Sequence, residues 1–286
     1  GCTDPEACNY DETADVDDGS CDYICHDNGD YSLSFDGVDD YVLIDGFDGS
    51  FTEFSFVTRA YIESVHSPQH MLFYFGVEEG GSNQYTRSID LGIDNVNYSP
   101  SFLRINLNYD YGEVGTQNYL ENSWVNMAGI FNGSNQTLSF YLDNMLVGSI
   151  DTAVDEIVFS SNDSHNTIGT GWTADYITNF FHGNISSLAF WDIIIDVDSL
   201  QMAYNHQFAT NNLIANWKMN SGQGNTLYDY SGNQNHGIIN GASWVGCTDP
   251  LADNYLLNAE VDDGSCTGPV NALDFTYAGE LDGHYY

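Results

Sequence analysis

All six cysteines of this 286-residue chain lie in its outer segments, and the long central stretch contains none. Residues 1–21 (GCTDPEACNYDETADVDDGSC) align without a gap with residues 246–266 (GCTDPLADNYLLNAEVDDGSC), so the chain carries an internal repeat. A segment of about 20 residues cannot bury a core of its own and needs covalent or metal cross-links. The cysteines therefore indicate two small cross-linked modules around one large domain that folds without them.

The repeat alignment also predicts how the cysteines pair. The first and last cysteines of the first copy match the two cysteines of the second copy, so each copy is expected to close its own loop. Cys8 has no counterpart in the second copy, which leaves Cys25 as its partner. A zinc site would need four clustered thiolates or imidazoles, and the second copy has two cysteines and no histidine. The predicted disulfides are Cys2–Cys21, Cys8–Cys25 and Cys247–Cys266, which implies a secreted, extracellular protein.

Oxygen donors at shared positions of the two copies predict bound Ca²⁺. Carboxylate and amide oxygens in a tight, glycine-containing loop are the ligands that this hard cation selects. The alternative is that Asp-Asp-Gly-Ser forms a turn and that Asp4 caps it. The predicted ligands are Asp4, Asn9, Asp17, Asp18, Asp249, Asn254, Asp262 and Asp263.

The repeated string resembles a module of very large secreted surface proteins of gliding and marine bacteria, which the type IX system exports. The resemblance rests on Gly-Cys-Thr-Asp-Pro, Asn-Tyr and Asp-Asp-Gly-Ser-Cys, each present whole in both copies. It implies that 1–30 and 246–267 are spacer modules in a longer array. Within 268–286, the string LDFTYAGELDGHYY resembles the first strand of a C-type-lectin-like domain, the alternative being a disordered terminus.

Acidic residues outnumber basic ones by 42 to 4, which gives a formal charge of −38. Such a chain repels phosphate backbones and anionic lipid surfaces, so neither nucleic-acid binding nor membrane docking is expected. No apolar run reaches the roughly 18 residues of a membrane-spanning helix, so no membrane insertion is expected. A large negative charge also destabilises a compact state unless cations offset it, which is a second reason to expect Ca²⁺ dependence.

The central residues 31–245 have the pattern of β-strands joined by turns. Apolar and polar residues alternate over 87–94 and over 103–108, as in strands with one buried face and one wet face. Asp143-Asn144 predicts a two-residue hairpin loop, since both residue types tolerate positive φ. One short helix is expected over 198–205, with Asp196 or Asp198 as its N-cap. The pattern predicts an all-β sandwich.

Three stretches of the central region carry a family resemblance: SLSFDGVDDYVLI at 32–44, SWVNMAGIFNGSNQTLSFYLDNMLVGS at 123–149 and HGNISSLAFWDIII at 182–195. They are similar to laminin-G-like domains of the concanavalin-A-like jelly-roll class, and their order also resembles pentraxins. Residues 213–244 resemble the Trp–acidic–Gly-rich segment of that family. The resemblance implies a jelly-roll β-sandwich over 31–245 and a function among lectins, adhesion modules and glycanases.

Catalysis is not expected. The glucanases of this class carry Glu-x-Asp-x-x-Glu on one strand, and no such string occurs here. Asp90 and Asp94 share a strand face but lie about 13 Å apart at roughly 3.3 Å per residue, which is too far for the carboxyl pair of a glycosidase. No Gly-x-Ser-x-Gly elbow is present, and His236 is expected to be a packed or capping side chain.

The resemblance to pentraxins implies Ca²⁺ at the rim of the sandwich, with Asn83 and Asp175 at the aligned positions. The family's run of acidic and amide ligands is replaced here by Thr-Gly-Trp-Thr-Ala-Asp-Tyr, which favours a single ion over two. The loop Asp36-Gly37-Val38-Asp39-Asp40, together with Asp229, is a further candidate oxygen-rich site, for which a plain turn is the alternative.

Glycan contact requires exposed aromatic rings beside short polar groups, because a sugar offers apolar C–H faces and many hydroxyls. Trp124, Trp191 and Trp217 occur in apolar strands and are expected in the core. Asp90 and Arg104 are expected on the wet strand face beside the rim loops. The predicted glycan-binding residues are Tyr85, Arg87, Trp172, Tyr176, Asn106 and Asn108.

These features together predict a non-enzymatic, calcium-stabilised adhesion or glycan-recognition segment at a bacterial cell surface. Its expected partners are glycans and neighbouring modules of the same chain. The alternative is a structural subunit of a surface filament formed by homo-assembly, and a polysaccharide-degrading enzyme is the third possibility. Asp-Thr-Ala and Asp-Ser-Leu resemble the acceptor motif of bacterial O-glycosylation, which makes Thr152 and Ser199 candidate acceptors.

Overall fold

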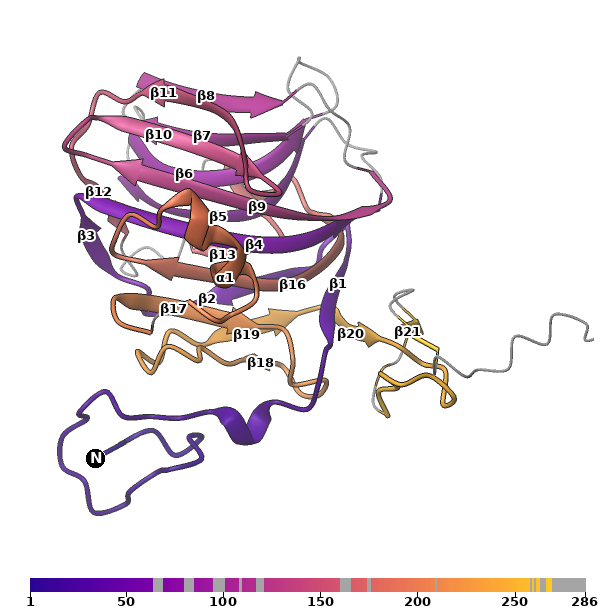
Figure 1. Cartoon of the computed structure of the whole chain (residues 1–286). Coiled ribbons are helices and arrows are strands. Elements are labelled where there is room, and N and C mark those ends of the chain that lie inside the picture. Colours follow the sequence, from indigo (N-terminus) through magenta and orange to yellow (C-terminus); the bar gives the residue numbers. More distant parts are fainter. Residues whose placement is uncertain are drawn as a thin grey trace, which may run out of the picture.

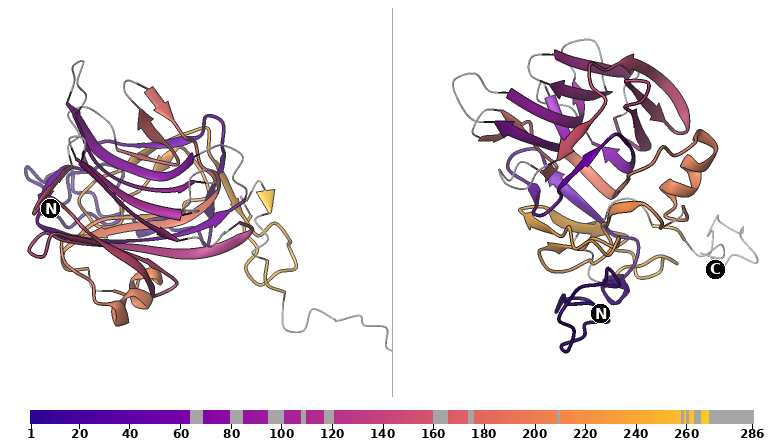
Figure 2. Two further views of the ribbon diagram at one scale, coloured as in Figure 1. Left: turned by 90° about the horizontal axis from the view of Figure 1, so that it is seen from above. Right: turned by 90° about the vertical axis from the view of Figure 1, so that its left-hand side faces the viewer.

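The computed structural model describes residues 1–63, 69–79, 85–94, 101–107, 110–116, 121–159, 166–173, 176–208, 210–257, 259, 261–262 and 266–268. Two large sheets stack face to face as a β-sandwich (Figures 1 and 2). The first sheet contains, in spatial order, β11 (Met145–Asp151), β10 (Thr137–Leu142), β9 (Ser123–Asn132), β4 (Glu53–Ile62), β16 (His182–Trp191), β1 (Ser32–Asp36), β20 (Ser243–Gly246) and β21 (Val261–Asp262), and β17 (Leu213–Lys218) also pairs with β16.

The second sheet contains β18 (Thr226–Leu227), β19 (Gly237–Asn240), β2 (Tyr41–Ile44), β13 (Thr167–Ile168), β5 (Gln69–Glu79), β6 (Tyr85–Asp94), β7 (Ser101–Leu107) and β8 (Asp110–Thr116). Two small two-stranded sheets complete the strands: β3 (Gly49–Phe51) pairs with β12 (Ile157–Phe159), and β14 (Gly171–Thr173) forms a hairpin with β15 (Tyr176–Thr178). The helical segments are η1 (Ile24–His26), η2 (Val197–Ser199) and α1 (Leu200–Tyr204). None of the helices in the described ranges is long and apolar enough to cross a membrane.

Aromatic side chains fill the space between the two sheets. Phe47 is 1% exposed, and its ring centroid lies 5.2–5.5 Å from those of Phe75, Phe159, Phe190 and Trp217. Rings at these distances pack edge-to-face or offset, which adds to the stabilisation from burial alone. The predicted core positions of Trp191 and Trp217 are confirmed, as both are buried.

The outer face of the first sheet is partly covered by α1, which lies against β4, β9 and β16 (Figure 2). Val57, Ala128 and Ala189 present small apolar side chains there, and Leu200 and Ala203 of the helix pack onto them. The carboxylate of Asp196 accepts a hydrogen bond from the Ser199 N–H and so caps η2. The predicted short helix near residues 198–205 is therefore confirmed, with Asp196 as the cap.

The predicted alternation of β6 is confirmed on its core face and wrong on its other face. Ile89, Leu91 and Ile93 are buried as expected, but Asp90 is also fully buried. The strand register places Tyr74 opposite Asp90 and Met71 opposite Gly92, so these residues share the outer face. The β14–β15 hairpin lies over the β5 part of that face, because Gly171 lies against the Met71 side chain. A sequence pattern does not show this second layer.

All three predicted disulfides are present: Cys2–Cys21, Cys8–Cys25 and Cys247–Cys266. The hairpin loop between β10 and β11 is also confirmed, since Asp143 and Asn144 both have positive φ, at 45° and 65°.

Candidate functional site

A pocket of about 600 Å³ lies on the outer face of the first sheet, beside the end of α1. Its floor is formed by outward-facing residues of β4, β9, β16 and β17. Its walls come from 27–32, which link the first repeat to β1, from 204–206 at the end of α1, and from Asn254 of the second repeat. The pocket therefore forms where the sandwich meets both repeats.

The strand register sets the floor of this pocket. Ser187 of β16 lies opposite Arg59 of β4 on one side and opposite Lys218 of β17 on the other. Residues in one such row point to the same face of a sheet. Two of the four basic residues of the chain thus lie on one floor, on either side of a serine.

Trp124 forms an aromatic side of the pocket and is half-buried. The prediction that it lies in the core is wrong. Val125 and Met127 of β9 face the core, and side chains alternate along a strand, so Trp124, which precedes Val125, faces outward. The Cζ of Arg59 lies 5.4 Å from the centroid of the Trp124 ring, and the centroid of the Tyr61 ring lies 5.8 Å from the same centroid. A cation above an indole face is attracted by the ring quadrupole, which orients the guanidinium.

The wall formed by the linker segment is held by hydrogen bonds. The Asn28 N–H donates to the Asn220 carbonyl at 3.0 Å, and the Asn28 side chain donates to the Ser221 carbonyl at 2.7 Å. The Tyr230 hydroxyl donates to Asn220 Oδ1 at 2.8 Å, and Lys218 Nζ lies 5.0 Å from the Tyr230 ring centroid. These contacts fix the polar groups of this wall before any ligand arrives.

An acidic loop lies elsewhere, between β1 and β2. Carboxylate oxygens of Asp36, Asp39 and Asp40 all lie within 4.8 Å of one another, a donor set that could hold a metal ion. Burial of the Asp40 carboxyl, reinforced by the charges of Asp36 and Asp39, raises its pKa above the ordinary value. Asp229, predicted as a partner of this loop, is instead buried in its own loop, where its carboxylate accepts hydrogen bonds from Asn216, Ser231 and Asn235.

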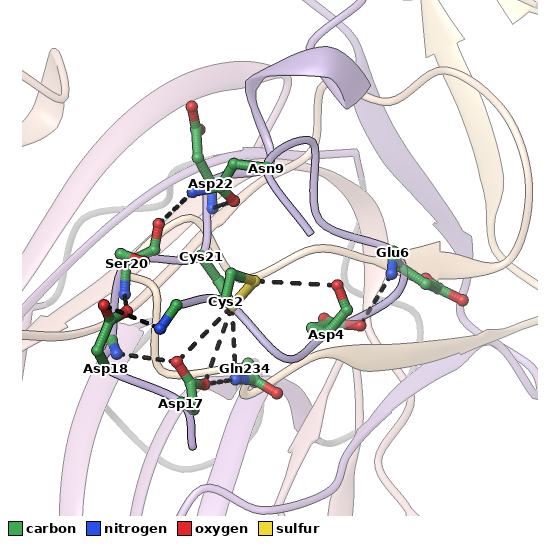
Figure 3. The surroundings of a disulfide bond; sticks show 12 residues. Cys2, Asp4, Glu6, Asn9, Asp17, Asp18, Ser20, Cys21, Asp22 and Gln234 are labelled. Atoms are coloured by element: carbon green, nitrogen blue, oxygen red, sulfur yellow. Dashed lines mark hydrogen bonds and ion pairs between the residues drawn. A yellow bond between two sulfur atoms is a disulfide. The ribbon is translucent and has the colours of Figure 1, made fainter. Parts of the chain in front are cut away.

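The oxygen donors of the first repeat make hydrogen bonds within turns and to the sandwich (Figure 3). Asp4 accepts from the Glu6 N–H, Asn9 accepts from the Asp22 N–H, and Asp18 accepts from the Ser20 N–H. Asp17 accepts from the Gly19 N–H and from the side chain of Gln234 in the sandwich. These bonds match the turn alternative, and Ca²⁺ binding in this repeat stays a prediction.

Corresponding bonds occur in the second repeat. Asp249 accepts from the Leu251 N–H at 2.9 Å, and Asn254 accepts from the Thr267 N–H at 2.7 Å. Asp262 contacts the Cys266 sulfur, while Asp263 lies outside the described residues. Ca²⁺ binding in the second repeat also stays a prediction.

The predicted rim-loop residues are only partly covered by the structure. Asn83, Asp175 and Asn108 lie outside the described residues. The backbone of β6 contains Tyr85 and Arg87, that of β7 contains Asn106, and the β14–β15 hairpin contains Trp172 and Tyr176. Both candidate glycosylation sites are described: Thr152 is a buried residue whose hydroxyl donates to the Val154 carbonyl, and the Ser199 hydroxyl donates to Asp196.

Sequence reasoning did not find the pocket residues Arg59, Trp124 and Lys218. Arg59 and Trp124 are 65 positions apart in sequence, and Lys218 follows the core residue Trp217, so no motif joins them. The one available signal was charge, because basic residues are rare in this chain and all four of them occur in strands.

Two mainly antiparallel sheets that enclose an aromatic core, with a short helix on one outer face, define a lectin-like β-sandwich. The family model of the concanavalin A-like lectin/glucanases superfamily matches residues 36–201, which is more than half of the chain, and the chain belongs to this superfamily. No curated protein matches this chain.

Two solved structures share the fold. A proposed carbohydrate-binding protein from Bacteroides ovatus superposes with a TM-score of 0.57 at 17% identity, covering 79% of this chain and 62% of that one. A heptameric SAP-like pentraxin from Limulus polyphemus gives a TM-score of 0.50 at 13% identity, covering 76% of this chain and 95% of that one. The chain therefore spans about three fifths of the Bacteroides protein. At these identities the likeness shows the fold alone.

Proposed function

We propose that this chain is a non-enzymatic glycan-recognition segment of an extracellular surface protein, and that it binds sugar in the pocket beside α1. The observation that carries the proposal is the composition of that pocket, in which a half-buried indole lies among short polar side chains. An indole face suits the apolar C–H face of a pyranose, and Ser, Asn and Asp groups suit its hydroxyls. Membership of a lectin-containing superfamily and the proposed carbohydrate binding of the Bacteroides protein agree with this function.

The rim loops remain a second proposed glycan-binding location. Trp172 and Tyr176 belong to one hairpin, where Trp172 pairs with Ile177 and Thr173 pairs with Tyr176. Two aromatic residues on one hairpin are a reasonable sugar platform, and a rim Ca²⁺ at Asn83 and Asp175 would order it. The two locations use different tryptophans, so they can be tested separately.

Ca²⁺ is proposed to bind the loop Asp36-Gly37-Val38-Asp39-Asp40. The donor set fits this ion, because three carboxylates converge and Gly37 allows the sharp turn with a φ of 77°. The Asp36 carboxylate accepts from the Val38 N–H, and the Asp40 carboxylate accepts from the Asp36 N–H, so the loop is shaped without an ion. Bound Ca²⁺ would relieve the repulsion among these charges and fix the turn that joins β1 to β2.

Extracellular surface display is proposed from the disulfides and the repeats. Three disulfides in flanking segments favour an oxidising compartment. The repeats would present the sandwich between neighbouring modules of a longer surface protein, and export by the type IX system is proposed from the resemblance of those repeats.

A glycan array probed with the whole 286-residue chain tests glycan binding. Trp124→Ala should abolish binding if the pocket is the site, whereas Trp172→Ala should do so if the rim hairpin is. Tyr10→Ala, which removes a 45% exposed ring in the first repeat, is the aromatic control and should leave binding unchanged. A wild-type chain that binds no glycan on a broad array would contradict the proposed function.

A structural role in a surface filament is the second candidate, and one observation favours it. Leu251 and Leu257 of the second repeat are 78% and 79% exposed, at positions where the first repeat has Glu6 and Glu12. Exposed apolar side chains in place of acids are a feature of contact surfaces. If the second repeat mediates assembly, the wild-type chain should associate in light scattering, and Leu251→Glu with Leu257→Glu should return it to a monomer.

A further inference from the structure

The pocket beside α1 concentrates positive charge in a chain that has almost none. Of the four basic residues against 42 acidic ones, Arg59 and Lys218 both line it. Neither side chain forms an ion pair or hydrogen bond with any residue that the structure describes; each instead lies over an aromatic ring, Trp124 or Tyr230. In so acidic a chain, two cations that do not pair with any carboxylate among the described residues indicate an anionic partner from outside.

The geometry allows Arg59 and Lys218 to contact the same anionic group of a ligand. Arg59 and Lys218 lie in one row across three adjacent strands, with Ser187 between them. At a strand spacing of about 4.8 Å, their Cα atoms lie about 10 Å apart on the same face of the sheet. Both side chains are long enough to reach a single carboxylate above Ser187, where Arg offers a planar pair of donors and Lys a point charge.

The other lining groups show that the partner is not merely an anion. Asp27 and Asp30 also line the pocket, and both are exposed. Their carboxylates would repel a dianion such as a phosphate monoester but would accept hydrogen bonds from hydroxyl groups. Asn205 and Asn220 add amides that can both donate and accept. One ligand face must therefore be anionic and another rich in hydroxyls.

We propose that this pocket binds an acidic sugar, namely a pyranose ring that carries a carboxylate. The carboxylate lies between Arg59 and Lys218, an apolar face of the ring lies against Trp124, and the hydroxyls bond to Asp27, Asp30 and the two Asn side chains. A volume of about 600 Å³ holds one ring and its nearest neighbour, so the site recognises one acidic unit of a longer glycan. The assignment rests on the proposed function and adds the class of sugar.

Isothermal titration of the whole chain with tri-galacturonate and with its carboxyl-reduced counterpart tests the assignment. These two trisaccharides differ only in their carboxylates. The acidic one should bind at least tenfold more tightly. Arg59→Gln and Lys218→Met should each remove most of that preference while leaving the weak binding of the neutral trisaccharide within twofold.

Control variants separate local charge from net charge and from folding. Met145→Glu lowers the net charge by the same single unit as Arg59→Gln, on a residue of β11 that is 70% exposed, and should leave the preference intact. Arg59→Lys keeps the charge and should retain part of the preference. Unchanged melting temperatures would show that each variant folds.

Each contrary outcome has its own meaning. Equal binding of the two trisaccharides would overturn the acidic-sugar assignment while the proposed glycan function stands. Tighter binding of a 6-sulfated galactose trisaccharide would overturn the choice of a carboxylate. If neither trisaccharide binds, the assignment is wrong, and the glycan array then decides whether the proposed function falls with it.

Discussion

The imidazole Nε2 of His236 lies 3.0 Å from Asp4 Oδ2, so a loop of the sandwich contacts the first repeat across 232 positions of sequence. The backbone N–H of Asp229 donates to Nδ1 of the same ring, which leaves Nε2 to donate to Asp4. Tyr23 donates its hydroxyl to the same Asp4 oxygen at 2.6 Å, and its ring packs against Tyr228. His236 is therefore a packed side chain, as predicted, and it joins two parts of the fold.

Asp4→Asn should loosen the first repeat from the sandwich. Two hydrogen bonds to a partly buried carboxylate are weakened, which corresponds to a loss of about 2 kcal/mol in the free energy of docking. Asp249→Asn is the matched control, because Asp249 occupies the same repeat position, is exposed and accepts from the Leu251 N–H alone among the described residues. Hydrogen exchange of residues 228–236 should increase in Asp4→Asn and stay unchanged in Asp249→Asn.

The same contact should depend on pH. Burial raises the pKa of Asp4, but the bonds from Tyr23, the Glu6 N–H and His236 outweigh it and hold the pKa below 3.8. A lowered carboxyl pKa gives stability that is present above the unfolded value and is lost as the pH falls through the folded value. The stability difference between wild type and Asp4→Asn should thus be constant above pH 5 and shrink below pH 3.8. A difference independent of pH down to pH 2 would disprove this role of the Asp4 charge.

Removal of Ca²⁺ should destabilise the sandwich at neutral pH. The raised pKa of Asp40 means that its ionisation costs folding energy as the pH rises, and a bound cation reverses that cost. Added Ca²⁺ at 100 times its dissociation constant should contribute about 2.7 kcal/mol. Asp39→Asn should reduce the rise in melting temperature, whereas Asp45→Asn, a nearby exposed acid outside the cluster, should not. Equal melting curves with chelator and with Ca²⁺ would contradict the metal assignment.

The two disulfides of the first repeat should differ in importance. Cys2 and Cys21 are buried in the cluster that packs against Tyr228 and Tyr230, whereas Cys8 and Cys25 are exposed. Replacing Cys2 and Cys21 by Ala should cost about 2–5 kcal/mol of repeat stability and also remove packing. Replacing Cys8 and Cys25 removes only the cross-link. Cleavage by an Asp-specific protease, read by mass spectrometry, should therefore be faster within 1–30 in the first variant than in the second.

Local signals predicted much of this fold. The disulfide pairs followed from a gapless repeat, the β10–β11 loop from Asp143-Asn144, and the helix cap from Asp196, because each depends on residues close in sequence or on an internal copy. The core face of β6 was predictable for the same reason. Each of these features is specified by a short segment, through its hydrophobic period or through the residues of one turn type.

Features that depend on tertiary neighbours could not be predicted in this way. Asp90 is buried on a sheet face that a distant hairpin partly covers, and the pocket exists because β4, β16 and β17 align Arg59, Ser187 and Lys218. Strand order and register fix that row, and neither is written in any single segment. Trp124 is the exception, since the core positions of Val125 and Met127 already imply that it faces outward.

The chain enters the sandwich through β1 and leaves it through β20, and these strands are antiparallel neighbours in which Ser32 pairs with Val245. The entry and exit points are thus side by side, and Leu256 of the second repeat lies against Gly29 just before β1. Tension applied through the two repeats would load this one edge and would not stretch the aromatic core. The aromatic core therefore lies off the line of force, whereas the pocket walls at 27–32 and Asn254 belong to the loaded segments.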